Sequence, residues 1–205
     1  MRRRIVVVSA GLGQPSSTRL LGDLLATAAG DALLEEGLES GTEVIELREH
    51  AHDLANTLLT GFATGGLREA LDRLATADAV IAVTPVYQGS YSGLFKTFFD
   101  VVDREALRGT PVLLAATGGT ARHSLVLEYA MRPLFAHLGA SPAGTAVFAA
   151  SEDWGAAGAA GQGLTARIQR AGTELARLAA GRVNEGPRDP FADPVPFEQL
   201  LGTDR

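Results

Sequence analysis

Hydroxyl-bearing residues and glycines stand between a short apolar segment and a helix-like segment near the start of the chain. This stretch reads Ser9-Ala10-Gly11-Leu12-Gly13-Gln14-Pro15-Ser16-Ser17-Thr18-Arg19. Hydroxyls, the N–H groups of a helix start and a cation are the groups that bind a phosphate monoester. The predicted phosphate ligands are Ser9, Ser16, Ser17, Thr18 and Arg19. The spacing matches neither G-x-G-x-x-G nor the Gly-Lys-Ser/Thr of a P-loop. The alternative is an ordinary helix N-cap.

A second segment, Thr84–Asp100, places a proline and a glycine around a turn that presents a tyrosine at its rim. A flat aromatic ligand could stack on such a rim. The candidate contacts are Tyr87 and the backbone amides of this turn. The alternative for Tyr87 is a half-buried core ring whose hydroxyl reaches water.

A third segment runs from Ala116 to His123 and contains the pair Gly118-Gly119. Paired glycines at a strand end let the backbone approach a ligand edge without interference from a Cβ. Thr117 and the N–H groups of Gly118 and Gly119 could hydrogen-bond the polar edge of a pyrimidine-like ring. The alternatives are a plain Gly-Gly turn and, for His123, a residue that merely starts a helix.

Alternating strand-like and helix-like segments must position these three loops. Five strands are predicted, and they are Ile5–Val8, Val44–Leu47, Ala79–Thr84, Val112–Ala116 and Thr145–Ala149. Five helices are predicted between and after them, and they are Leu20–Glu36, Leu67–Thr76, Gly93–Val102, Ser124–Leu138 and Leu164–Ala180. Unbroken apolar strands indicate a parallel sheet buried on both faces. The pattern predicts an α/β, flavodoxin-like three-layer sandwich, in which ligands bind beyond the carboxyl ends of the strands. A count of five strands fits the flavodoxin-like strand order 2-1-3-4-5 better than the six-stranded dinucleotide fold, although the sequence does not itself give the order.

Two segments depart from this alternation. The Gly- and Ala-rich stretch Glu152–Gly163 surrounds the single tryptophan, Trp154, and is predicted to be a mobile surface loop. From residue 184, prolines alternate with spaced Phe and Leu residues, which favours an extended arm lying on a surface, either of this subunit or of a partner subunit. The predicted organisation is one domain over residues 1–183 and a Pro-rich arm over 184–205.

Composition excludes several classes of function. The chain has 205 residues, a net charge of −6 and no cysteine. Without cysteine there is no disulfide, zinc-thiolate site, iron–sulfur cluster or thiol redox chemistry, so a redox role needs a bound cofactor. No basic block follows Arg2–Arg4, which argues against a nucleic-acid partner. The histidines show no metal-binding spacing, and no run of about 18 apolar residues predicts a membrane span. We therefore expect a cytoplasmic protein without a metal.

The segment Thr84–Asp100, the run Ala116-Thr117-Gly118-Gly119-Thr120 and the run Tyr129-Ala130-Met131-Arg132-Pro133 together resemble the flavodoxin-like NAD(P)H-dependent FMN reductases. The resemblance is greatest to reductases that supply reduced flavin to alkanesulfonate-type monooxygenases, and it extends from Arg4 to about Leu138. It implies FMN and NADPH or NADH as cofactors, a flavin-dependent monooxygenase as a possible partner, and a homodimer or homotetramer. It also implies that the first loop holds the FMN phosphate and that Thr117, Gly118 and Gly119 meet the polar edge of the isoalloxazine. In the second loop it implies that Pro85, Val86 and Tyr87 lie along the isoalloxazine and ribityl chain, and Ser90 is a further candidate contact.

The resemblance further implies hydride transfer from the nicotinamide to N5 of FMN, with no catalytic side chain. His123 and Tyr129 are candidate residues near the flavin. In some relatives a tyrosine at the position of Tyr129 sits on a π-bulge at a tetramer interface, although Tyr129 could equally belong to a regular helix. Two alternatives remain open: a flavodoxin-type electron carrier, and a quinone or azo reductase on the same scaffold.

Overall fold

The computed structural model describes residues 2–154 and 159–182, and of residues 159–162 it describes the backbone alone. The predicted C-terminal arm, residues 184–205, lies outside the described residues. None of the helices in the described part of the chain combines the length and the low polarity needed to cross a membrane.

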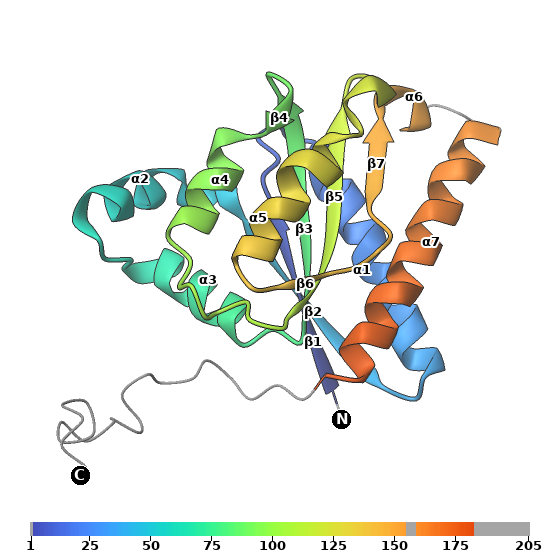
Figure 1. Ribbon diagram of the computed structural model, residues 1–205, viewed down its shortest axis with the longest axis horizontal. Coiled ribbons are helices and arrows are strands. Elements are labelled where there is room, and N and C mark those ends of the chain that lie inside the picture. The colour runs from blue at the N-terminus through green and yellow to red at the C-terminus, as the bar shows by residue number, and fades with distance from the viewer. Residues whose placement is uncertain (1, 155–158, 183–205) are drawn as a thin grey trace, which may run out of the picture.

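A twisted parallel sheet forms the middle layer (Figure 1). Its strands are β1 (Arg2–Ser9), β2 (Glu39–Glu46), β3 (Ala79–Tyr87), β5 (Pro111–Gly118), β6 (Ser141–Pro142) and β7 (Val147–Ala150). Their order is β2-β1-β3-β5, after which β6 pairs with the start of β5 and β7 with its end. Since β6 and β7 share the fifth position, the order 2-1-3-4-5 predicted from the sequence is confirmed. A short strand β4 (Ser90–Tyr91) folds back antiparallel on the end of β3.

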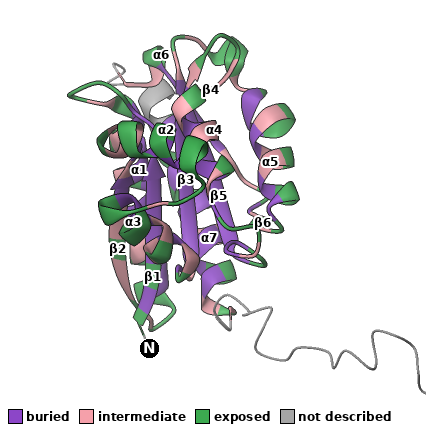
Figure 2. Ribbon diagram, turned by 90° about the vertical axis from the view of Figure 1, so that its left-hand side faces the viewer, coloured by how far each residue is buried: buried purple, intermediate pink, exposed green. Residues whose placement is uncertain are grey.

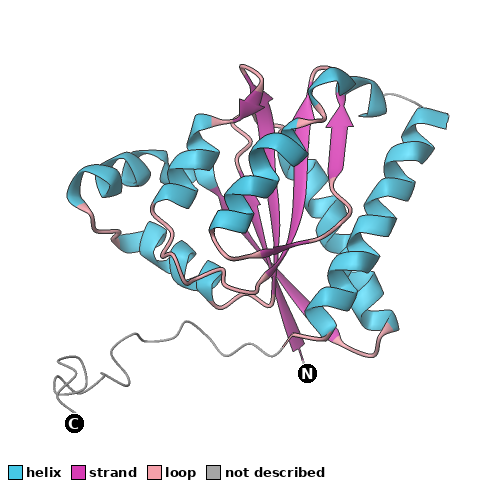
Figure 3. Ribbon diagram, viewed as in Figure 1, coloured by secondary structure: helices cyan, strands magenta, loops and turns pink. Residues whose placement is uncertain are grey.

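Helices cover both faces of the sheet (Figure 3). The long helices α1 (Ser17–Glu35) and α7 (Ala159–Ala180) pack on one face. The opposite face carries α2 (Ala51–Thr60), α3 (Gly65–Ala75), α4 (Gly93–Asp100) and α5 (Arg132–His137). Short helical turns complete the structure, and they are η1 (Leu47–His50), η2 (Ala121–His123), η3 (Leu127–Met131) and α6 (Ser151–Trp154).

Side-chain alternation along the central strands builds two cores. In β1, Ile5 and Val7 face α1 and α7, whereas Val6 and Val8 face α2–α5, and all four are fully buried. Figure 2 shows β1, β3 and β5 as largely buried strands between partly exposed helices. Burial of both faces explains why these strands read as unbroken apolar runs.

The structure corrects three elements of the sequence prediction. Strand β2 begins at Glu39 rather than Val44, because an edge strand exposes its first, polar residues. The stretch predicted as the loop Glu152–Gly163 is helical on both sides of residues 155–158, which are outside the described residues. Asp153 stabilises the first of these turns by accepting from Ala150 N at 2.8 Å and from Arg167 at 3.0 Å. The helix predicted over Ser124–Leu138 contains the π-helical turn η3, which carries Tyr129.

Candidate functional site

A cleft of about 870 Å³ opens at the carboxyl ends of β1, β3 and β5. Its lining contains nine of the twelve residues predicted from the sequence, and they are Ser16, Ser17, Thr18, Pro85, Val86, Tyr87, Thr117, Gly118 and Gly119. Residues separated by as much as a hundred positions therefore meet at one edge of the sheet. This is where a doubly wound fold binds its ligands.

The first wall of the cleft is the loop that leads into α1. Ser16 is the N-cap of α1, and its Oγ accepts from the backbone N of Arg19 at 3.2 Å. A Cβ placed on Gly11 would lie 2.1 Å from Ser16 Oγ, so only glycine allows the loop to fold this closely. Ser9 is fully buried at the end of β1, and its Oγ makes no hydrogen bond to the described residues. A loop that leads into a helix N-terminus suits an anionic oxygen, and the unpaired Ser9 hydroxyl stands at the start of that loop.

The first and third loops are joined directly. The side-chain oxygens of Thr18 and Thr117 lie 2.8 Å apart, and both residues are buried. Thr117 is the penultimate residue of β5, opposite Pro85 in β3 and Ala149 in β7. The N-terminus of α1 is thereby fixed relative to the end of β5.

The second wall is a tight hairpin between β3 and β4. Gln88 and Gly89 form its turn with φ of 49° and 82°, the left-handed backbone that two-residue hairpins require. The backbone N of Ser92 donates to Thr84 Oγ1 at 3.0 Å, and Ser92 Oγ accepts from Phe95 N at the start of α4. These contacts hold Tyr87 at the rim of the cleft, where its side chain is 47% exposed and can stack on a ligand ring.

Arg19 does not line the cleft. Its guanidinium donates to Asp23 at 2.8 Å and to Glu46 at 2.7 Å. Hydrogen bonds to Asp23 and Glu46 raise the pKa of Arg19 above its ordinary value. Two carboxylates therefore offset the positive charge on which the predicted phosphate contact of Arg19 depended.

The structure places the remaining candidates as follows. Ser9 and Ser90 flank the cleft without lining it, in β1 and β4. His123 ends η2 and is exposed. Tyr129 is 79% exposed on the π-helical turn η3. Neither His123 nor Tyr129 lines the cleft within this chain.

Sequence reasoning missed part of the lining. The additional residues are Leu12, Gly13, Pro15, Leu20, Ser151 and Trp154. Trp154 also packs against the core beneath α1 and α7. Its position after β7, the next strand beyond β5, is the signal that could have identified it, because the carboxyl ends of all parallel strands meet at one edge.

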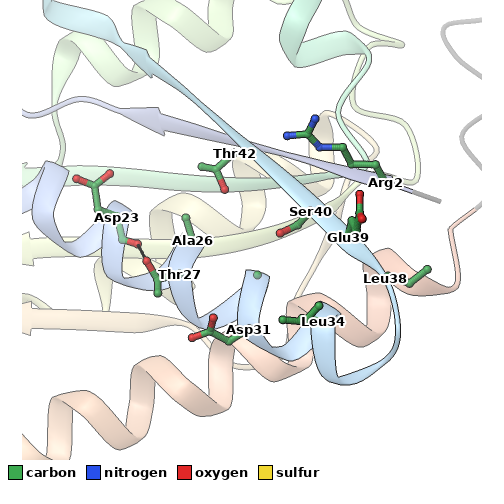
Figure 4. Close-up of a pocket in the computed structure, with 11 residues that line it drawn as sticks. Arg2, Asp23, Ala26, Thr27, Asp31, Leu34, Leu38, Glu39, Ser40 and Thr42 are labelled. Atoms are coloured by element: carbon green, nitrogen blue, oxygen red, sulfur yellow. Dashed lines mark hydrogen bonds between the residues drawn. The ribbon is translucent and has the colours of Figure 1, made fainter.

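Two further cavities lie away from these loops. One of about 650 Å³ is lined by residues of α4 and α5. The other, of about 550 Å³, lies between α1 and the start of β2, and Figure 4 shows Asp23, Asp31 and Glu39 among its side chains. Neither contains a residue predicted to bind the ligand. Within the described residues no group of three or more His, Asp or Glu side chains could hold a metal ion.

The cleft fits FMN. The hydroxyls of Ser16, Ser17 and Thr18 and the N-terminus of α1 lie at the part of the cleft where a phosphate monoester would be held. The unpaired Ser9 hydroxyl is buried at the end of β1, outside this lining. Tyr87 and Val86 offer an apolar rim for a ring system, and Thr117 with the Gly118 and Gly119 backbone offers a polar edge. All fifteen described lining residues are uncharged, so the cleft supplies hydrogen bonds and apolar contact and no ionised acid, base or nucleophile.

Comparisons with known proteins point to the same ligand. Residues 3–155 match the family model for NADPH-dependent FMN reductase. The chain is 41% identical over 179 residues to the FMN reductase (NADPH) of Pseudomonas aeruginosa, covering 87% of this chain and 94% of that protein. It is 39% identical over 167 residues to the NADH-dependent FMN reductase SfnE of Pseudomonas putida, covering 82% of this chain and 87% of that protein.

Solved structures agree with this assignment. An oxidoreductase from Corynebacterium diphtheriae superposes with a TM-score of 0.86 at 43% identity, over 89% of this chain and 99% of that one. The apo form of the NADH:FMN oxidoreductase EmoB superposes with a TM-score of 0.69 at 26% identity, over 84% of this chain and 90% of that one. The chain is an oxidoreductase that uses FMN with NADPH or NADH, and it belongs to the NADPH-dependent FMN reductase family.

Proposed function

We propose that this chain binds FMN in the cleft between the α1 loop and the Tyr87 hairpin and reduces it with NADPH or NADH. The observation that carries the proposal is the cleft itself, in which a helix N-terminus with three hydroxyl residues opens onto an aromatic rim. When bound, the isoalloxazine supplies the redox chemistry, accepting a hydride at N5 from the nicotinamide.

The protein's own contribution is position. Ser16, Ser17 and Thr18 anchor the phosphate, and Thr117 with the Gly118 and Gly119 backbone orients the polar edge of the ring. The exposed side of Tyr87 leaves room for a second planar ring to enter from solvent. Hydride transfer to a flavin requires no proton from a side chain, and the described lining of the cleft contains no ionised group.

We further propose that the reduced flavin is passed to a flavin-dependent monooxygenase. Reduced FMN that leaves a reductase needs a protein that consumes it, and the resemblance of the Thr84–Asp100 segment is greatest to reductases with such partners. The need for NADPH or NADH also favours a cytoplasmic location, where these nucleotides are regenerated.

We also propose that the chain forms a homodimer or a homotetramer. Leu125 and Tyr129 expose 59% and 79% of their surface on neighbouring turns at the start of η3, and exposed apolar side chains that cluster mark interaction surfaces. Light scattering on the wild type and on Tyr129→Ser tests it. We expect Tyr129→Ser to have a lower molar mass in solution than the wild type. A monomeric wild type would refute the proposed self-association.

The deciding experiment is an FMN titration followed by steady-state assays with NADPH and NADH in the presence of excess FMN. Loss of nicotinamide absorbance at catalytic enzyme concentration is the expected result. FMN binding without nicotinamide oxidation would instead indicate a flavodoxin-type electron carrier. Much faster turnover with a quinone or an azo dye than with FMN would indicate a reductase of those acceptors. Absence of FMN binding would refute all three.

A further inference from the structure

A single arginine holds the outer half of the α1 loop from outside. Arg48 lies in η1, directly after β2, and its Nη1 donates to the carbonyl oxygen of Gly13 at 3.4 Å. With the amide of Gln14 turned so that its oxygen faces the guanidinium, that oxygen accepts from Nη2 at 2.6 Å and from Nη1 at 2.7 Å. Gly13 and its neighbours Leu12 and Pro15 line the cleft. The Arg48 side chain therefore contacts the outer wall of the cleft from behind.

The positive charge of Arg48 is not neutralised locally. Among the described residues Arg48 makes no ion pair with a carboxylate, and its partners are a carbonyl and an amide oxygen. Arg19, by contrast, is bound by Asp23 and Glu46, which leaves that group of three with a net negative charge. A phosphate monoester brings up to two negative charges into a cleft whose described lining has none of either sign.

We propose that Arg48 is a positioning residue for the FMN phosphate: it fixes the Gly13–Gln14 segment and supplies the uncompensated positive charge that makes the loop selective for a phosphorylated flavin. This inference rests on the proposed function, since it requires FMN in the cleft. Arg48 acts through the loop backbone and through its charge, and it does not touch the reacting atoms.

The test compares FMN with riboflavin, which has the same ring and ribityl chain but no phosphate. Dissociation constants for both are measured by flavin fluorescence in the wild type and in Arg48→Met, Arg48→Lys and Gln14→Ala. Arg48→Met is expected to weaken FMN binding by about tenfold or more while riboflavin binding changes by less than about twofold. Arg48→Lys should recover part of the preference for FMN, and Gln14→Ala, which retains the charge, should keep most of it.

Salt and a matched variant separate charge from loop structure. The FMN preference of the wild type should fall as ionic strength rises, and that of Arg48→Met should respond less, because salt screens the partly exposed charge of Arg48. Arg68→Met is the control, since it removes one positive charge from an exposed ion pair on α3 without touching the loop. It should leave both dissociation constants unchanged. Thermal unfolding of each variant verifies that it is folded.

Each outcome decides the proposal. If Arg48→Met retains the wild-type preference for FMN, or weakens FMN and riboflavin equally, Arg48 has no role toward the phosphate and the inference is wrong. If the wild type itself binds FMN no better than riboflavin, the phosphate assignment of the α1 loop fails first. If the wild type binds neither flavin, the proposed function fails and this inference fails with it.

Discussion

Thr18 and Thr117 are joined by a hydrogen bond between their side-chain oxygens, 2.8 Å apart and buried at the floor of the cleft. One residue belongs to the first turn of α1 and the other to the end of β5. The contact links the wall assigned to the phosphate with the wall assigned to the polar edge of the ring, so their spacing is set by the folded protein before a ligand arrives.

Thr117→Val should lower the free energy of unfolding by about 1–3 kcal/mol, because it leaves the buried Thr18 hydroxyl without its partner. Urea unfolding measures this change. Thr97→Val is the control, since the Thr97 hydroxyl bonds only to the carbonyl of Gly93 in its own helix, α4, at an exposed position. Equal effects of the two substitutions would show that the buried pair has no special role.

Gly11→Ala should weaken FMN binding by at least about tenfold, because its Cβ would fall 2.1 Å from Ser16 Oγ and displace the α1 loop. A flavin titration provides the measurement. Gly93→Ala at the start of α4 is the matched control, since a Cβ there meets no atom within 4 Å. Wild-type affinity in Gly11→Ala would mean that the loop can relax without cost.

Trp154→Ala should raise the dissociation constant for FMN about fivefold through loss of about 1 kcal/mol of ring contact. Leu178→Ala serves as the comparison, because Leu178 is 41% exposed on α7 and does not line the cleft. If both variants bind FMN like the wild type, Trp154 serves only to pack against α1 and α7.

The ionisation of Glu174 is expected to make the stability of the fold depend on pH. Burial favours its neutral form, but hydrogen bonds from Thr145 and Gly144 and the charge of Arg132 outweigh burial and lower the pKa of Glu174 below its ordinary value of 4.5. Its carboxylate accepts from Gly144 N at 2.6 Å and from Thr145 N at 3.0 Å. A group with a lowered native pKa stabilises the fold fully above its unfolded pKa, and this contribution is lost as the pH falls through the native value.

Glu174→Gln should therefore be less stable than the wild type at pH 7, and the difference should shrink as the pH falls below about 4. Urea unfolding of both proteins at pH 7 and below about pH 4 measures this difference in the free energy of unfolding. Glu69→Gln on the exposed face of α3 should show neither effect. A difference that stays constant with pH would mean that the Glu174 contacts do not depend on ionisation.

The central strands of the sheet were predictable because β1, β3 and β5 are buried on both faces and so appear as unbroken apolar runs, whereas the strand order followed from the number of strands. The start of β2 could not be predicted, because the residues from Glu39 to Glu43 are polar, as the edge position of this strand permits. Helix α2 was missed as well. It buries only Leu54 and Thr57, too few residues to create a clear helical repeat.

Most of the cleft was predictable because each of its loops follows a recognisable strand. The ion pairs of Arg19 could not be predicted in full. Asp23 lies one helical turn away in the same helix, α1, but Glu46 is the last residue of β2 and is brought to Arg19 by the fold. The link from Arg48 to Gly13 was equally hidden, since it depends on how η1 packs beside the α1 loop. Sequence spacing identifies which side chains reach the edge of a sheet, whereas tertiary contacts determine which charges remain unpaired there.

The polar edge strand β2 has a consequence for aggregation. Glu39 and Glu43 lie along it, and the Arg2 guanidinium covers Gly41, where an added Cβ would lie 2.8 Å from it. The opposite edge is divided between the short strands β6 and β7, whose connecting loop is tethered by Glu174. Charged and interrupted edges prevent strands of another chain from adding to a sheet. Among the described residues, the sheet is therefore protected against edge-to-edge polymerisation, which leaves the helical surfaces as the parts of this fold better suited to contacts between copies of the chain.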